Sequence, residues 1–371
     1  MKKKLLAALL AGVMALSLVA CGGGETETPE ETPEQPKGEA PVEDSGSDIV
    51  VGFSTGAAGT SFRQQGIDDF TKVAEEYKAE GRIKDYKIVN NVTNWDANEQ
   101  ANIIRDFIND DEINVIVVNP NSPTDLNGVL AEAVAAGKTV VAADCEVDVE
   151  GVYCVSIDHY TWGYKVAEHI CEALGGEGNV IQVYGGEGHP ANNERMRATD
   201  DVLKKYPNIK MVSSTSGGWD NQTAKDITSQ LLGSGLKIDG VITQDSMGYG
   251  CLSAFTDLGM EPKAAFVECG TANAKLYQEM LDNGSTMKMC SQPNPASIVA
   301  SGLRMAVNLA EGKEPADGAL GGLYGRCFIY DVQAWFTEDT FQDMKALVEN
   351  EGDDYLLTEY WTEDEAQAFF K

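Results

Sequence analysis

The sequence is poor in positive charge and in histidine. It has 28 Lys and Arg residues against 59 Asp and Glu residues, which gives a formal net charge of −31 at pH 7. Such a chain repels phosphate backbones and anionic membrane surfaces, so the composition argues against nucleic-acid binding and suits a soluble monomer. The three histidines, His159, His169 and His189, are not spaced like metal ligands. We therefore expect neither a nucleic-acid partner nor a bound metal.

Motifs of nucleotide and redox sites are also missing. The sequence has no C-x-x-C, and no G-x-G-x-x-G or Walker A motif follows a predicted strand. The glycine-rich stretch 185–189 lacks the third glycine, and Glu187 stands where a phosphate would sit. We therefore expect no cofactor.

The main apolar run of the sequence lies near its start. Lys2, Lys3 and Lys4 precede about sixteen apolar and small residues, 5–20. This is the layout of a secretory signal, and the run is shorter than the roughly 20 residues of a membrane span. It ends in Leu-Val-Ala-Cys at Cys21, which resembles the lipobox of bacterial lipoproteins. That resemblance implies cleavage before Cys21 and a lipid on its thiol, with an ordinary signal peptide as the alternative. We expect an extracytoplasmic protein held to the bacterial cell membrane by the lipid alone.

A linker is predicted directly after Cys21. Residues 22–47 contain eight acidic residues, one lysine and almost no large apolar residue. Such a segment cannot bury enough apolar surface to offset the entropy lost on ordering. We divide this region into a signal peptide, 1–20, and an anchored cysteine with a disordered acidic linker, 21–47.

The cysteines do not indicate a disulfide framework. Seven of the eight cysteines remain once Cys21 is set aside, an odd number spread over a large chain. Two pairs lie close enough in the predicted topology to form disulfides, Cys145 with Cys154 and Cys269 with Cys290. Most of the seven are expected to be small core residues.

The rest of the chain alternates short apolar strands with amphipathic helices. Ile67, Phe70, Ala74 and Tyr77 share one helical face, whereas Val115–Val118 is a continuous apolar run. Such a run is typical of a parallel strand covered on both faces of its sheet. The same alternation restarts near residue 152. We therefore predict an α/β fold of two doubly wound parallel-sheet lobes, with a cleft between the carboxyl ends of the two sheets.

The predicted lobes are discontinuous in sequence. The N-terminal lobe is expected to contain residues 48–157 and 293–322, and the C-terminal lobe residues 158–292 and 323–330. Residues 331–371 form an extension with twelve acidic and eight aromatic residues. Aromatic residues at this density favour an element packed on one lobe, and a docking surface for a partner is the alternative.

One sequence motif suggests a hydrolase. Gly52-Phe53-Ser54-Thr55-Gly56 satisfies G-x-S-x-G, the nucleophile elbow of α/β-hydrolases. The elbow requires a sharp turn from a strand directly into a helix. Here the motif ends the first predicted strand, and the next helix starts only near Ser61. A secreted hydrolase that uses Ser54 is therefore a disfavoured alternative, and we expect no enzyme.

Polar and aromatic side chains follow the predicted strands where the cleft should lie. Flat rings stack on sugar faces, whereas amides and carboxylates pair with hydroxyl groups, each of which costs about 1–3 kcal/mol if it is buried without a partner. Asp220 and Asn193 can alternatively be helix N-caps, and Arg195 can instead stabilise its lobe. The candidate ligand-binding residues are Phe62, Arg63, Asn119, Asp144, Asn193, Trp219, Gln244, Glu268 and Gln292.

Several segments, in order and in spacing, resemble the type I periplasmic sugar-binding proteins, the ribose- and galactose-binding-like receptors of ABC transporters. They include Ser61-Phe62-Arg63, Asn119-Pro120, Trp219-Asp220 and Gln292-Pro293. The resemblance covers roughly residues 48–325. It implies three crossovers between the lobes, a hinge that closes on a small sugar or polyol, and delivery to a membrane permease. The same fold also serves sensors that signal to a chemoreceptor or a histidine kinase.

The sequence departs from this family at the expected pocket. Asp144 is followed by Cys145 where ribose-binding members have an arginine, and Cys269 stands where an aspartate is expected, beside Glu268. These departures argue against a simple ribose or glucose pocket. They leave another small polyol or a modified sugar as the expected ligand.

Overall fold

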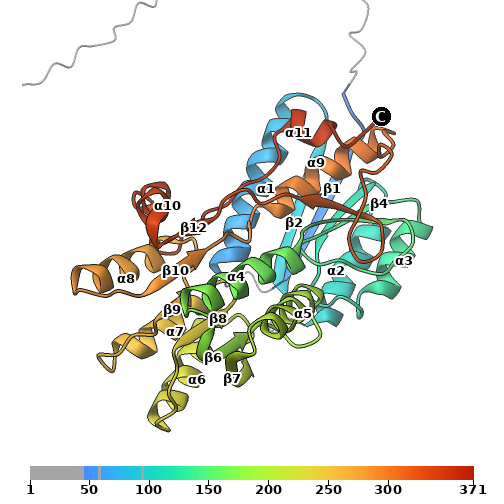
Figure 1. The fold of residues 1–371 in the computed structure, drawn as a ribbon. Helices are drawn as coiled ribbons and strands as arrows, with labels where there is room; N and C mark the ends of the chain where they lie inside the picture. The colour runs from blue at the N-terminus through green and yellow to red at the C-terminus, as the bar shows by residue number, and fades with distance from the viewer. Residues whose placement is uncertain (1–45, 57–59, 93–95) are drawn as a thin grey trace, which may run out of the picture. The chain divides into compact units, whose positions relative to one another are not determined.

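The computed structural model describes residues 46–56, 60–92 and 96–371 (Figure 1). The predicted signal peptide, the lipid-anchored Cys21 and nearly all of the acidic linker lie outside the described residues. The described chain contains two six-stranded sheets, each flanked by helices. This architecture confirms the prediction of two α/β lobes.

The first sheet has the strand order β11-β5-β4-β3-β1-β2, and all neighbouring strands are parallel. Its helices are α1, α2, α3, α9 and the short C-terminal α11. The bounds are β1 Val50–Gly56, α1 Ser61–Ala79, β2 Asp85–Val92, α2 Ala97–Asn109, β3 Val115–Asn119, α3 Asn127–Ala135, β4 Thr139–Ala143, β5 Val152–Ile157, α9 Ile298–Ala310, β11 Cys327–Tyr330 and α11 Glu363–Gln367.

The second sheet has the order β12-β10-β9-β8-β6-β7, parallel except for β12, which runs antiparallel to β10. Helices α4 to α8 and α10 belong to it. The bounds are α4 His159–Ala173, β6 Glu177–Tyr184, α5 Pro190–Lys205, β7 Asn208–Ser216, α6 Asn221–Gly233, β8 Gly240–Thr243, α7 Met247–Thr256, β9 Ala264–Phe266, α8 Thr271–Asp282, β10 Lys288–Ser291, β12 Phe336–Thr337, the 3-10 turn η1 Glu338–Thr340 and α10 Phe341–Val348.

The core of the first lobe lies on both faces of its sheet, as the apolar run in β3 predicts. All five residues of β3 are buried. Val117 packs in the cluster that holds Phe53 and Phe70, whose rings stack 4.1 Å apart, whereas Ile116 packs with Phe107 on the other face. Successive side chains of a strand point to opposite faces, so a strand between two helical layers must be apolar throughout.

The last strand of the first sheet corrects the predicted lobe boundary. Residues 323–330 were expected in the C-terminal lobe, but β11 pairs in parallel with β5, with Cys327 opposite Cys154 and Tyr330 opposite Ile157. Phe328 is buried, and its ring lies 5.9 Å from that of Tyr153. These strand pairs and this buried ring place β11 at the edge of the N-terminal lobe.

The chain passes between the two sheets three times, the number that the family resemblance implies, and then once more. The three crossovers connect β5 to α4, β10 to α9 and β11 to β12. The extension then forms α10 beside α8 and returns to the first lobe, where α11 packs on α9 (Figure 1). The extension therefore contacts both lobes. The favoured prediction, that it packs on one lobe only, is wrong. We call residues 353–358 the fourth crossing.

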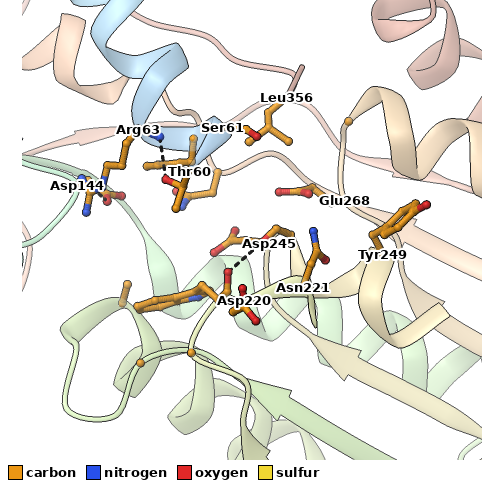
Figure 2. A pocket seen from close by; sticks show the side chains of 18 of the residues that line it. Thr60, Ser61, Arg63, Asp144, Asp220, Asn221, Asp245, Tyr249, Glu268 and Leu356 are labelled. Atoms are coloured by element: carbon orange, nitrogen blue, oxygen red, sulfur yellow. Dashed lines mark hydrogen bonds and ion pairs between the residues drawn. The ribbon is translucent and has the colours of Figure 1, made fainter. Parts of the chain in front are cut away.

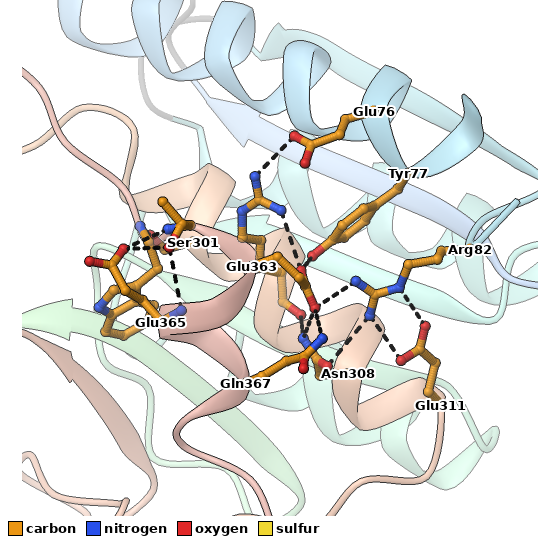
Figure 3. A network of polar contacts seen from close by, with 12 residues as sticks. Glu76, Tyr77, Arg82, Ser301, Asn308, Glu311, Glu363, Glu365 and Gln367 are labelled. Atoms are coloured by element: carbon orange, nitrogen blue, oxygen red, sulfur yellow. Dashed lines mark hydrogen bonds and ion pairs between the residues drawn. The ribbon is translucent and has the colours of Figure 1, made fainter. Parts of the chain in front are cut away.

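A polar network anchors α11 to the first lobe (Figure 3). The Glu363 carboxylate accepts hydrogen bonds from the Tyr77 hydroxyl and from Arg304, and Arg82 forms an ion pair with it at 2.6 Å. Arg82 also donates to Glu311 at 2.7 Å. Burial alone would raise the pKa of Glu363, but its hydrogen bonds, from Tyr77 first, lower it to about 2. The carboxylate is thus ionised where α1, α9 and α11 meet.

The seven cysteines of the described chain are free and buried. The two possible disulfides, Cys145–Cys154 and Cys269–Cys290, are therefore not formed. Cys269 instead places its sulfur 2.8 Å from the Ser291 hydroxyl oxygen. Burial raises the pKa of the Cys154 thiol to about 12, which keeps it protonated. These side chains act as small apolar core residues.

Candidate functional site

A cavity of about 1160 Å³ lies between the carboxyl ends of the two sheets. Its lining comes from the start of α1 and the end of β4 in the first lobe, and from the ends of β8 and β9 and the loop before α6 in the second. Figure 2 shows Thr60, Ser61 and Arg63 across the cavity from Asp220, Asp245 and Glu268. Open α/β sheets bind ligands at this edge.

Three residues of the cavity wall have a left-handed backbone. Asp144, Trp219 and Asp245 have φ angles of 72°, 60° and 49°, and they are the non-glycine residues with positive φ in the described chain. A side chain in this conformation costs free energy, and such residues cluster at functional sites. All three line the cavity. The backbone strain of the described chain is therefore concentrated in one place.

The first lobe contributes a buried arginine and carboxylate. Thr60 caps α1 by accepting a hydrogen bond from the Arg63 amide at 3.3 Å, so Phe62 and Arg63 start the helix at the cavity. The Arg63 Nη1 lies 3.9 Å from the Asp144 Oδ2. Burial lowers the pKa of Arg63 and raises the pKa of Asp144, and the attraction between the two groups opposes both shifts. A hydrogen-bond donor and an acceptor therefore lie side by side at the cavity.

The second lobe provides a matching pair. Arg195 donates from Nη1 to the Asp245 Oδ2 at 2.6 Å, and its guanidinium carbon lies 4.0 Å from the centre of the Trp162 ring. His159 Nδ1 is 3.2 Å from Arg195 Nη2. Burial, followed by repulsion from Arg195, lowers the pKa of His159 well below its usual value, so this imidazole is neutral. Arg195 is thus held by an aromatic face, a neutral histidine and a carboxylate.

Trp219 forms an aromatic platform at the cavity wall. Its Nε1 donates to Gln244 at 3.1 Å, and the His189 ring meets it edge to face at 4.9 Å. A Cβ at Gly185 would lie 2.1 Å from the indole, so the glycine-rich loop after β6 makes room for this ring. Burial and the nearby Arg63 and Arg195 lower the pKa of His189 to about 3. The indole is therefore positioned by neutral groups.

Glu268 is a buried acid at the centre of the cavity wall. It is 8% exposed, and Asn273 Nδ2 donates to its Oε2 at 3.4 Å. Burial and then repulsion from Asp245 raise the pKa of Glu268 to about 8. This carboxyl group is consequently protonated at neutral pH, and it can donate a hydrogen bond as well as accept one.

The structure places five of the nine predicted ligand residues in the cavity lining: Phe62, Arg63, Asp144, Trp219 and Glu268. The other four, Asn119, Asn193, Gln244 and Gln292, are not among the lining residues. Asn119, Gln244 and Gln292 are buried. Gln244 supports the site from behind, because it accepts from Trp219 and donates to the Asn192 Oδ1 at 3.0 Å.

Neither Asn193 nor its neighbour Asn192 is among the lining residues of the cavity. Asn193 is exposed on α5, where its amide donates to the Gly188 carbonyl at 3.4 Å, and the N-cap of that helix is His189. Asn192 is the buried member of the pair. Asp220 is indeed the N-cap of α6, with its carboxylate accepting from the Thr223 amide at 2.7 Å, and it also lines the cavity.

Sequence reasoning misses several lining residues. Asp245 lies two residues after the end of β8, next to the predicted Gln244, so the rule that polar residues follow strands could have found it. Arg195 both stabilises its lobe and lines the cavity. The first role made the second one hard to predict from the sequence. Tyr249 on α7 and residues 353–356 of the extension carry no local signal of a site. Their place depends on contacts distant in sequence.

Ser54 does not form a nucleophile elbow. It is fully buried within β1, and its hydroxyl oxygen accepts from Gln100 Nε2 at 3.4 Å. A Cβ at Gly52 would lie 2.8 Å from the Phe107 ring, so close packing explains the first glycine of the motif. Within the described ranges, no three His, Cys, Asp or Glu side chains form a potential metal site. The helices of the described chain include none of sufficient length and apolarity to span a membrane.

Comparison with known proteins places the fold and the site in a family. The sequence profile of the periplasmic binding protein domain matches residues 51–314, more than half of the chain. The xylitol-binding protein of Mycolicibacterium smegmatis is 27% identical over 67% of this chain and 65% of its own length. The D-allose-binding periplasmic protein of Escherichia coli is 28% identical over 52% of this chain and 64% of its own length. The chain therefore spans less than two thirds of either relative.

A solved structure extends this similarity. The ABC transporter solute binding protein from Thermobispora bispora has a TM-score of 0.73 and 25% identity, over 86% of this chain and 94% of the other. Its match and the family profile agree with the two parallel sheets and the cavity between them. The chain belongs to the periplasmic binding protein family and has the type I fold of its sugar-binding members, as the sequence resemblance predicted.

Proposed function

We propose that this protein captures a small sugar or polyol in the cavity between its lobes and delivers it to an ABC permease. The observation that carries the proposal is the pairing of a buried arginine with a carboxylate in each lobe, Arg63 with Asp144 and Arg195 with Asp245. The names of the xylitol- and D-allose-binding relatives support this ligand class.

The chemistry of the cavity suits a ligand rich in hydroxyl groups. A hydroxyl group both donates and accepts, so it needs partners of both kinds. Arg63 and Arg195 donate, Asp144 and Asp245 accept, and Glu268 can do either. Trp219 offers a flat face for the C–H side of a sugar ring. The site thus combines polar groups for orientation with an aromatic surface for apolar contact.

Ligand binding is expected to favour a closed arrangement of the lobes. A ligand shifts a conformational equilibrium only when it binds one state more tightly than the other. A sugar that contacts Arg63 and Arg195 together gains more contacts when the lobes approach each other. Closure then reports occupancy, which is what a permease or a signalling partner would recognise.

Calorimetry and small-angle scattering test this proposal on the same protein. We expect at least one member of a panel of pentoses, hexoses and polyols, xylitol and D-allose included, to bind and to lower the radius of gyration. Binding without compaction would contradict the closure mechanism. No binding by any member would contradict the ligand class.

The Trp219 platform can be tested separately. We expect Trp219→Ala to weaken binding by about tenfold or more, which corresponds to about 1.4 kcal/mol. Trp335→Ala is the matched control, because Trp335 is half-buried and is not among the lining residues of the cavity. Equal affinities for the two variants would remove Trp219 from the site.

We also propose that the protein acts outside the cytoplasm, anchored through a lipid on Cys21. Labelling cells with a palmitate analogue should modify the full-length protein, and Cys21→Ser should abolish the labelling. A labelled Cys21→Ser protein would contradict the anchor. Co-purification with a permease or with a histidine kinase separates transport from sensing.

A further inference from the structure

The fourth crossing forms part of the cavity wall. Residues 353–356 line the cavity, although the family profile ends at residue 314. Figure 2 shows Leu356 beside Ser61, on the Glu268 side of the cavity. This wall is therefore supplied by a segment outside the residues that the family profile matches.

The second lobe holds the crossing as if it were an extra strand. The Thr271 amide donates to the Tyr355 carbonyl at 3.0 Å, and the Leu357 amide donates to the Cys269 carbonyl at 2.7 Å. Leu356 forms an antiparallel bridge with Gly270, where a Cβ would lie only 3.1 Å from the Leu356 side chain. The crossing thus lies tightly against the loop between β9 and α8.

The first lobe holds the opposite edge of the same segment through one glutamine. Gln65 Nε2 donates to the Leu356 carbonyl at 2.7 Å, and the Leu356 amide donates to Gln65 Oε1 at 3.0 Å. A single side-chain amide therefore satisfies both backbone groups of Leu356. Thr358 adds a hydroxyl contact to Ser297 at 2.6 Å. Because Gln65 is two residues from Arg63, the position of Leu356 is fixed relative to the polar part of the cavity.

Three apolar side chains line this side of the cavity, among polar neighbours such as Asp353, Tyr355 and Lys275. Leu356 lies half-buried at the wall together with Ala272 and Leu276 of α8. None of these side chains can hydrogen-bond, and burying a ligand hydroxyl against them would leave it without a partner. Arg63, Asp245 and Glu268 provide the polar partners elsewhere in the same cavity.

We propose that the fourth crossing builds an apolar subsite, and that the preferred ligand is a sugar or polyol carrying a small apolar group, such as a deoxy position or an O-methyl group, directed at Leu356. Gln65 is the positioning residue of this subsite. The proposal rests on the proposed function and specifies the ligand class further.

The test compares matched ligand pairs by calorimetry. The probes are D-galactose with 6-deoxy-D-galactose, D-allose with 6-deoxy-D-allose, and each free sugar with its methyl glycosides. Burying one methylene-sized group is worth about fourfold in Kd. We therefore expect the unmodified protein to bind at least one deoxy or O-methyl derivative about fourfold more tightly than its parent sugar.

Two variants and a control distinguish the contribution of the Leu356 side chain from that of Gln65, which positions it. Leu356→Ala removes the apolar side chain but keeps the backbone hydrogen bonds, and Gln65→Ala releases the crossing from α1. Both should reduce the preference for the derivative to about one. Gln64→Ala is the matched control, because Gln64 is exposed on the same helix and donates to Asp68 at 2.9 Å. It should keep the full preference.

Thermal unfolding and hydrogen exchange show whether the variants remain folded and whether Gln65→Ala releases the crossing. The variants should unfold cooperatively, and Gln65→Ala should speed exchange of the Leu356 amide. Equal affinity of the unmodified protein for parents and derivatives overturns the subsite and leaves the proposed function standing. A preference that survives in Leu356→Ala and Gln65→Ala also overturns it. Failure of the unmodified protein to bind any of these probes, and any pentose or polyol of the wider panel, contradicts the proposed function itself.

Discussion

At the scale of single residues, the site combines strained backbone with buried ionisable groups. Asp144, Trp219 and Asp245 keep left-handed backbones at the cavity wall. Glu268 is buried beside Asp245 and has its pKa raised to about 8. Each feature costs stability in the absence of ligand. Selection for stability alone does not explain why they lie together, whereas ligand binding does.

The raised pKa of Glu268 predicts how stability depends on pH. A carboxyl group whose pKa is higher in the folded than in the unfolded state stabilises the fold while protonated, and this contribution is lost as the pH rises towards the folded pKa. Glu268→Gln keeps the neutral form at every pH. We expect the melting temperature of Glu268→Gln, relative to the unmodified protein, to rise between about pH 5 and pH 8.

Differential scanning calorimetry across this range provides the measurement. Glu177→Gln, at an exposed position at the start of β6, is the control and should show no such trend. A difference in melting temperature between Glu268→Gln and the unmodified protein that does not change with pH would show that Glu268 is ionised in the folded protein.

The limits of sequence reasoning are clearest at Asn193 and Asn192. The rule that polar and aromatic residues follow strands leads to Phe62, Asp144, Trp219 and Glu268, all of which line the cavity. It cannot decide which of two adjacent asparagines points inward, because that depends on where α5 begins. The helix begins at Pro190, and Asn192 is buried on it.

At the scale of elements, the C-terminal helix α11 depends on one carboxylate. Glu363 meets Tyr77, Arg82 and Arg304, side chains from two other segments of the chain (Figure 3). These partners are far from Glu363 in sequence. The sequence therefore indicated an aromatic extension but not where it would pack.

We expect Glu363→Gln to lower the melting temperature, because it leaves two arginines without this carboxylate at a cost of about 1–3 kcal/mol. The pKa of Glu363, about 2, lies below the usual value, so its contribution is present above about pH 4.5 and is lost as the pH falls towards 2. The melting temperatures of the variant and the unmodified protein should therefore converge in acid.

Asp364→Asn is the control for this prediction. It removes one negative charge from an exposed position of the same helix. A loss of stability as large as that of Glu363→Gln would mean that the helix dipole, and not the network, holds α11 in place.

At the scale of the whole molecule, the alternation of strands and helices was sufficient to predict two parallel lobes. The predicted lobe boundary after residue 322 is wrong, because the sequence of an edge strand does not indicate which sheet the strand joins. β11 joins the first sheet through its pairing with β5, about 170 residues earlier in the chain. Pairing partners at such separations follow from the assembled fold and not from local sequence.

The net charge of −31 predicts a salt effect on stability. Like charges repel one another in the compact state, and salt at about 0.1 M screens this repulsion beyond about 10 Å. We expect the melting temperature to rise as sodium chloride increases from about 10 mM to about 150 mM. A decrease would show that favourable ion pairs, such as Arg82 with Glu363, outweigh the overall repulsion.

The interleaved path of the chain has a consequence for how the protein folds. The first lobe includes α9, β11 and α11, which all come after the second sheet's parallel strands in sequence. Nearly the whole chain must therefore emerge before the N-terminal lobe can be completed, whereas the second lobe has its parallel strands by residue 291. The lobe that begins first along the chain is thus completed last, and it must remain protected from aggregation in the meantime.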